Sequence, residues 1–218
     1  MSASRTPLVA ANWKMHKTIA ETEEFIAGFL PRVYAADGVD VALCVPYTAL
    51  GALVDSTRGS RVQVFAQNMH QDASGAHTGE ISAPMLTELD VHGVVLGHSE
   101  RRADNGETDR ALALKVPAAQ DAGLLPILCV GETEAEREAG DTERKLRHQV
   151  QEGLEKVPTE RLGELVVAYE PIWAIGTGLV ATPQQAQDAC AFVRALVAAR
   201  SPEAAATVRV LYGGAMDA

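Results

Sequence analysis

Short runs of apolar, mostly β-branched residues alternate along the chain with longer segments in which apolar residues recur every three or four positions. The first pattern is typical of buried strands, and the second of amphipathic helices that pack on a sheet. This alternation predicts repeated strand–helix–strand units and a parallel sheet. The predicted strands are Leu8–Asn12, Val39–Cys44, Arg61–Ala66, Gly93–Gly97, Leu125–Val130, Glu164–Tyr169 and Thr207–Tyr212.

Helices are predicted between these strands from apolar stripes and capping signals. Over residues 19–33 the apolar side chains fall on one helical face. Thr133 and Thr182 are each followed three residues later by Glu or Gln, the spacing of a capping box, so helices are predicted to begin there. A further helix is expected over residues 108–122, although Pro117 lies inside it and removes a backbone donor.

Repeated units of this kind form either an open doubly wound sheet or a closed barrel, and the periodicity alone fits both. In both architectures the functional site lies at the carboxyl ends of the strands. The residues that follow the predicted strands include Asn12 and Lys14, Gly97 to Glu100, Gly131 and Glu132, Glu170, and Gly213 and Gly214. We therefore expect the site on this edge of the sheet.

Three of these strand-end residues are candidates for chemistry. Glu170 precedes a glycine-containing loop. If this loop covers the carboxyl group, desolvation raises the pKa of that group and makes it a candidate general base. The alternative is a solvated acid at the strand end that caps the loop. His98 precedes a short predicted helix, whose N-terminus would keep the imidazole neutral and able to donate a hydrogen bond; a capping or packing role is the alternative. Lys14 would present a cation to an anionic substrate, or is an ordinary surface lysine.

Residues 176–181 read Gly-Thr-Gly-Leu-Val-Ala, which fits the glycine spacing of a dinucleotide-binding turn. That interpretation fails because five residues separate Glu170 from the first glycine. A mobile lid whose amides close over an anion suits the position better. Gly213 and Gly214 could offer amides in the same way, or form a turn without a ligand.

Composition excludes several classes of function. The 218 residues are 47% hydrophobic and 22% charged, which predicts one globular domain over residues 1–218. A formal net charge of −10 argues against nucleic acid and anionic membranes as partners, and no apolar stretch is long enough to span a bilayer. Three cysteines without metal or redox spacing indicate a reducing, cytoplasmic setting. The six histidines lack the spacing of metal ligands, so neither a metal nor another cofactor is predicted.

Taken together, these motifs resemble the triosephosphate isomerase family. They are Ala11–Met15, Gly75–Ser82, Gly97–Arg102, Ile127–Thr133, Ala168–Gly178 and Leu211–Gly214, and they follow one another in the family's order. The resemblance implies an α/β fold of the TIM (β/α)₈-barrel type, incomplete here, with seven recognisable strands. It also implies interconversion of dihydroxyacetone phosphate and D-glyceraldehyde 3-phosphate through an enediolate, without a cofactor.

The resemblance assigns roles to individual residues. Glu170 would move a proton between two substrate carbons, His98 would polarise the carbonyl oxygens, and Lys14 with Asn12 would stabilise the negative charge that develops. The other implied positions are phosphate contacts at Gly176, Gly213, Gly214 and Ala215, supporting residues Ser99, Glu100 and Cys129, and an interface loop with Gln67, Thr78, Gly79 and Glu80. That loop implies self-association, as a homodimer or, with a second contact, a homotetramer.

The sequence departs from the family pattern at three places. Leu179 and Val180 replace a basic or polar pair after the lid, and Ala215 replaces the serine that usually follows the two glycines. The sequence reaches Ala218, whereas the family continues with a helix, an eighth strand bearing a second phosphate-binding glycine pair, and a final helix. We expect weakened phosphate binding and self-association that covers the sheet edges. Two hypotheses follow: an isomerase with weakened phosphate binding, and an isomerase-like scaffold that only binds or oligomerises.

Overall fold

The computed structural model describes residues 5–215, and their contacts divide the chain into two compact units. The N-terminal unit contains residues 6–95 and 118–126, and the C-terminal unit contains residues 96–117 and 127–215 together with Arg5.

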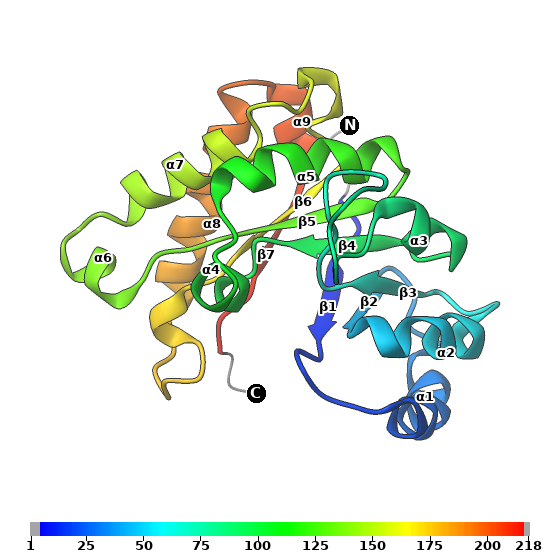
Figure 1. The fold of residues 1–218 in the computed structure, drawn as a ribbon. Coiled ribbons are helices and arrows are strands. Elements are labelled where there is room, and N and C mark those ends of the chain that lie inside the picture. Colours follow the sequence, from blue (N-terminus) through cyan, green and yellow to red (C-terminus); the bar gives the residue numbers. More distant parts are fainter. Residues whose placement is uncertain (1–4, 216–218) are drawn as a thin grey trace. The chain divides into compact units, whose positions relative to one another are not determined.

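All seven predicted strands are present, and their order in the sheet is their order in the chain (Figure 1). Where the register is defined, neighbouring strands run parallel, as the sequence predicts. The strands are β1 (Leu8–Asn12), β2 (Asp40–Val45), β3 (Val62–Ala66), β4 (Gly93–Leu96), β5 (Leu125–Val130), β6 (Val166–Tyr169) and β7 (Arg209–Tyr212).

The N-terminal unit is built on β1, β2, β3 and most of β4. Its helices are α1 (Ile19–Val33), α2 (Tyr47–Thr57) and α3 (Ala83–Glu88). Helix α2 packs on β3, and α1 packs on α2 (Figure 1). The core of this unit includes Leu43, Leu50 and Phe65, which are fully buried.

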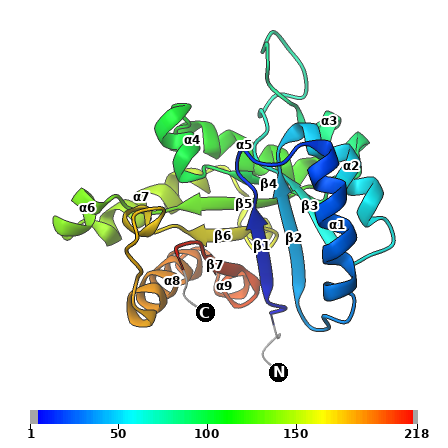
Figure 2. The same cartoon turned by 90° about the horizontal axis from the view of Figure 1, so that it is seen from below.

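The C-terminal unit contains β6, β7 and most of β5. Its helices are α4 (Ser99–Asp104), the greater part of α5 (Asp109–Asp121), α6 (Glu134–Glu138), α7 (Thr142–Gly153), α8 (Pro183–Ala198) and α9 (Pro202–Thr207), with short 3₁₀ turns at Thr159–Arg161 and Ile172–Ala174. Helix α8 packs on β6 and β7 and also contacts α7 and α9 (Figure 2). Capping boxes at Thr133 and Thr182 begin α6 and α8, as predicted.

Some strand boundaries differ from the prediction. The sixth strand begins two residues later than expected, because the N–H of Glu164 donates to the carbonyl of Arg161 within a turn. The seventh begins at Arg209, because Thr207 is the last residue of α9. The fourth ends before Gly97, whose φ of +75° leaves the strand region. The second and third strands begin one residue later than predicted.

The repeated alternation of parallel strands and helices confirms the predicted α/β fold. Among residues 5–215, no helix is both long enough and apolar enough to cross a membrane.

Candidate active site

Glu170 directly follows β6 and is buried. Its Oε2 accepts a hydrogen bond from the Ser99 N–H at 3.0 Å, and its Oε1 lies 3.4 Å from Nε2 of His98. The side chain is only 8% exposed, which excludes the alternative of a solvated strand-end acid. The structure thus places a buried carboxylate beside an imidazole at the end of β6.

His98 is the N-cap residue of α4. Its Nδ1 accepts a hydrogen bond from the Glu100 N–H at 3.3 Å, and a carboxylate oxygen of Glu100 lies 3.6 Å from the same nitrogen. An imidazole nitrogen that accepts carries no proton, so this contact assigns the proton of the neutral ring to Nε2. The protonated nitrogen is therefore the one that faces Glu170.

Arg102 fixes the strand ends around this pair. Its Nε donates to the Gly97 carbonyl at 2.7 Å, one terminal nitrogen donates to the Cys129 carbonyl at 2.9 Å, and the other donates to Asp109 at 2.6 Å. Gly97 has a φ of +75°, and a Cβ there would lie 2.6 Å from a methyl carbon of Leu112, so both the backbone conformation and the packing favour glycine. In this network Cys129 contributes its backbone carbonyl.

The buried carboxylate of Glu107 supports the segment around Gly97. Glu107 accepts the N–H of Gly97 at 3.1 Å and forms ion pairs with Lys115 and with Arg101, whose Nε lies 3.3 Å away. The side chains of Glu107 and Lys115 are 3% and 8% exposed. This support could not be predicted from the sequence, because an acid and a base eight residues apart are not neighbours on one helix face.

A second buried carboxylate, Glu132, holds the start of the predicted lid. Its Oε1 accepts hydrogen bonds from the Tyr169 hydroxyl at 3.0 Å, from the Trp173 ring N–H at 2.9 Å and from Arg137 at 3.2 Å. Burial, and then the charge of Glu132, raise the pKa of Tyr169, so its hydroxyl remains a donor. The guanidinium of Arg137 also lies 4.3 Å from the centroid of the Trp173 ring, which favours this arrangement.

The predicted lid is an exposed loop, and it includes Gly176. The hydroxyl of Thr177 donates to the Trp173 carbonyl at 2.7 Å and accepts the N–H of Leu179 at 3.2 Å, which gives the loop a local turn. Leu179 and Val180, the apolar pair, are 48% and 42% exposed. Leu179 and Val180, where the sequence departs from the family pattern, are therefore partly exposed to solvent.

The residues after β7 lie close to Glu170. A Cβ on Gly213 would come within 3.2 Å of the Glu170 Cγ, whereas one on Gly214 would meet the Tyr212 ring. The N–H of Gly213 donates to the Tyr169 carbonyl at 2.8 Å, and the N–H of Ala215 donates to the Ala174 carbonyl at 3.4 Å. Two of the backbone amides expected at phosphate therefore have partners within the protein.

Asn12, Lys14 and Gln67 form a separate group in the N-terminal unit. The Oδ1 of Asn12 accepts the Lys14 N–H at 2.9 Å and the Gln67 side-chain amide at 3.0 Å. The same amide lies 2.9 Å from the Lys14 carbonyl and 3.1 Å from the Cys44 carbonyl. Gln67, expected only as part of an interface loop, thus positions the Asn12–Lys14 turn, in which Lys14 has a φ of +52°.

The expected interface loop continues to its exposed tip at Thr78, Gly79 and Glu80. The His70 N–H donates to the Ile81 carbonyl at 2.8 Å and joins the two ends of the loop. The Glu80 N–H donates to the His77 carbonyl at 3.0 Å and shapes the tip. The exposed tip therefore belongs to a loop whose two ends are joined by a backbone hydrogen bond.

A parallel α/β fold with a buried carboxylate and an imidazole in contact at its strand ends is typical of enzymes that use acid–base chemistry. The family model described as triosephosphate isomerase matches residues 7–218. A protein named triosephosphate isomerase from Symbiobacterium thermophilum is 51% identical over 97% of this chain and 83% of that protein, and one from Synechocystis is 48% identical over 98% and 85%. The chain belongs to the triosephosphate isomerase family, and its fold is of the TIM-barrel type, with seven strands among the described residues.

Proposed function

We propose that this protein interconverts dihydroxyacetone phosphate and D-glyceraldehyde 3-phosphate through an enediolate. The contact between the Glu170 carboxylate and Nε2 of His98, at 3.4 Å within a buried site, carries the proposal. The names of the relatives support it, and nothing in these comparisons supports the alternative of a scaffold without chemistry.

Glu170 takes a proton from one substrate carbon and returns it to the neighbouring carbon. His98 passes the hydroxyl proton from the oxygen on the first carbon to the oxygen on the second, so the carbonyl and hydroxyl groups exchange places. A neutral His98 donates from Nε2 to the substrate oxygens, which stabilises the enediolate where its negative charge develops. The family resemblance assigns to Lys14 and Asn12, both in the N-terminal unit, a cation and an amide that stabilise this negative charge. Gln67 is a positioning residue in this scheme, because its side-chain amide holds both of them.

The phosphate group of the substrate is bound by backbone amides near Gly176 and Gly214. Four backbone amides, those of Gly176, Gly213, Gly214 and Ala215, are expected at the phosphate. The N–H groups of Gly213 and Ala215 already donate within the protein, so phosphate binding is weaker than four free amides would provide. Each missing hydrogen bond to the phosphate costs about 1.5–3 kcal/mol. Calorimetry with 2-phosphoglycolate tests this point, and tight micromolar binding would contradict it.

The protein also self-associates, as a homodimer or homotetramer, in the cytoplasm. The exposed tip at Thr78, Gly79 and Glu80 supplies one contact between subunits. The buried Cys44 and Cys129 and the half-buried Cys190, all reduced, are compatible with a reducing compartment. Light scattering at micromolar concentration measures the assembly, and a stable monomer would contradict it.

The catalytic assignment is tested by turnover measurements on the full chain. Glu170→Gln keeps the shape of the side chain but removes the base, so kcat should fall by at least about 10³-fold. Glu164→Gln is the matched control, because this exposed carboxylate belongs to a surface ion pair with Arg161 and should leave kcat unchanged. A Glu170→Gln variant that folds and keeps most of the activity would overturn the assignment.

A further inference from the structure

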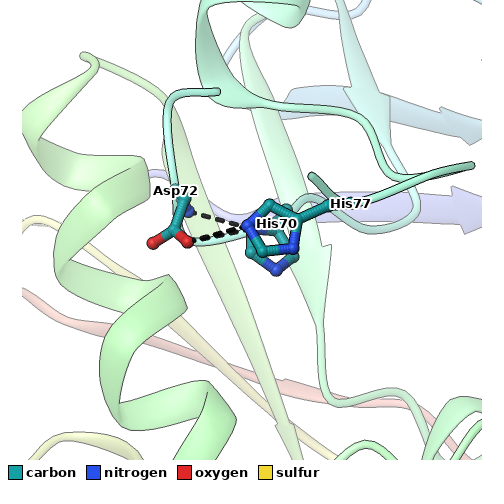
Figure 3. A group of neighbouring side chains, drawn as sticks. All are labelled: His70, Asp72 and His77. Atoms are coloured by element: carbon teal, nitrogen blue, oxygen red, sulfur yellow. Dashed lines mark hydrogen bonds and ion pairs between the residues drawn. The ribbon is translucent and has the colours of Figure 1, made fainter. Parts of the chain in front are cut away.

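Two imidazoles and one carboxylate meet in the loop that follows β3. His70, Asp72 and His77 each direct a potential ligand atom toward the others, and these three atoms all lie within 4.8 Å of one another (Figure 3). The cluster lies within the N-terminal unit. None of the three residues has a role in the proposed isomerisation.

The distances between these three atoms are close to those between neighbouring ligand atoms around a bound metal ion. Nε2 of His77 lies 3.0 Å from Oδ2 of Asp72, and Nδ1 of His70 lies 3.9 Å from the same oxygen. Ligand bonds of about 2.1 Å in tetrahedral geometry separate neighbouring ligand atoms by about 3.4 Å. Shifts of about 1.5 Å or less therefore bring all three atoms to bonding distance from one central ion.

The protonation pattern of His70 also suits a ligand. Its Nδ1 accepts the backbone N–H of Asp72 at 3.1 Å, so this nitrogen carries no proton and its lone pair points at that N–H. An ion would replace that N–H donor. The side-chain amide nitrogen of Gln71 lies 3.3 Å from Nε2 of His70, on the side of the ring opposite to the cluster.

The two rings constrain each other. Their centroids are 3.9 Å apart and their planes are inclined by 28°. Stacking restricts the rotation of both rings, so their nitrogen atoms stay near the Asp72 carboxylate.

The backbone holds the three side chains in this arrangement. The hydrogen bond from His70 to the Ile81 carbonyl closes the loop at its neck, which reduces the freedom that binding would have to remove. Gly75 has a φ of +150°, and a Cβ there would lie 3.0 Å from the His77 ring. Glycine thus makes room for the imidazole that completes the cluster.

We propose that His70, Asp72 and His77 form a binding site for one divalent transition-metal ion of the zinc type, with water completing the shell. Two nitrogen ligands and one oxygen ligand favour Zn²⁺, Cu²⁺ or Ni²⁺ over Ca²⁺ and Mg²⁺, which prefer oxygen. This site could not be predicted from the sequence, since the seven-residue spacing of the two histidines belongs to neither a zinc finger nor a helical metal motif.

The test is titration of the full chain, stripped with a chelator, with Zn²⁺ in a calorimeter. We expect one ion per chain for this site, and at least a tenfold loss of affinity in His70→Ala, His77→Ala and Asp72→Asn. Gly75→Ala should weaken binding as well, because it displaces the His77 ring. The readout is independent of turnover, so the result does not depend on the isomerase assignment.

The matched control is His148→Ala. His148 belongs to the other cluster of potential ligands among residues 5–215, with Asp109 and Glu152, and removing its imidazole should leave the affinity of the proposed site unchanged. Circular dichroism verifies that each variant folds, and NMR signals of the histidine rings show which rings Zn²⁺ perturbs. The proposal is overturned if wild-type protein does not bind Zn²⁺, if the three ligand variants bind it as wild type does, or if only His148→Ala abolishes binding.

Discussion

Replacing Lys115 by Met removes a buried charge while keeping the length of the side chain. Lys115 and its partner Glu107 are almost fully buried, and both belong to the C-terminal unit. In Lys115→Met, the Glu107 carboxylate stays buried and loses one of its two cations. Its remaining contacts are the Gly97 N–H at 3.1 Å and Arg101 at 3.3 Å.

Removing one partner of a buried ion pair costs about 3–5 kcal/mol, because the other charge is left without compensation. Because two contacts remain on Glu107, we expect the loss of unfolding free energy in Lys115→Met to lie at the lower end of this range, at about 3 kcal/mol. In a chain of this size each kcal/mol lowers the melting temperature by about 2–4 °C. The expected decrease is therefore about 6–12 °C.

Thermal unfolding followed by circular dichroism measures this decrease, and urea unfolding checks the free energy. The double variant Glu107→Leu with Lys115→Met should regain most of the lost stability, since no buried charge remains. Arg58→Met is the control: its ion pair with Asp55 is 67% and 77% exposed, so the change should stay below about 1 kcal/mol. A loss of less than about 1 kcal/mol in Lys115→Met, or a double variant less stable than Lys115→Met, would refute the reasoning.

Three other positions give direct tests. Gly213→Ala places a methyl group 3.2 Å from the Glu170 Cγ, so kcat should fall by up to about 10²-fold with little change in melting temperature; unchanged kinetics would contradict the proximity. Tyr169→Phe removes a donor to the buried Glu132 and should cost about 1.5–3 kcal/mol in urea unfolding, so a neutral effect would argue against this bond. Burial raises the pKa of Cys44 from 9.0 to about 12, so the native thiol should resist iodoacetamide at about pH 8.5 and react after denaturation. Because the folded-state pKa is the higher one, the contribution of Cys44 to stability is complete below about pH 9 and is lost as the pH rises toward 12.

The strands and several helix starts could be predicted because their signals are local. The apolar run of β6 ends at Glu170, and the spacing of a Thr and a Glu or Gln marks the starts of α6 and α8. The same kind of signal was missed at Ser201, which caps α9 ahead of Pro202, and this omission moved the predicted start of β7.

The partners of the site residues could not be predicted, because they depend on strand register. Gln67 reaches Asn12 only because β1, β2 and β3 pair in register, which aligns their carboxyl ends. The contact between Trp173 and Glu132 similarly joins residues 41 positions apart in the sequence. His70 and His77 meet only because of the path of one irregular loop.

The left-handed backbone at Lys14, with a φ of +52°, has an evolutionary consequence. Most L-residues lose about 1–2 kcal/mol in this conformation, whereas Gly, which lacks a Cβ, and Asn, whose short amide bonds locally, adopt it more easily. Lys14→Asn should therefore make the protein more stable while it removes the proposed cation. In a descendant that no longer needs the enzymatic activity, replacing this lysine would increase folding stability. A descendant that keeps Lys14 would therefore be one in which selection for catalysis continues.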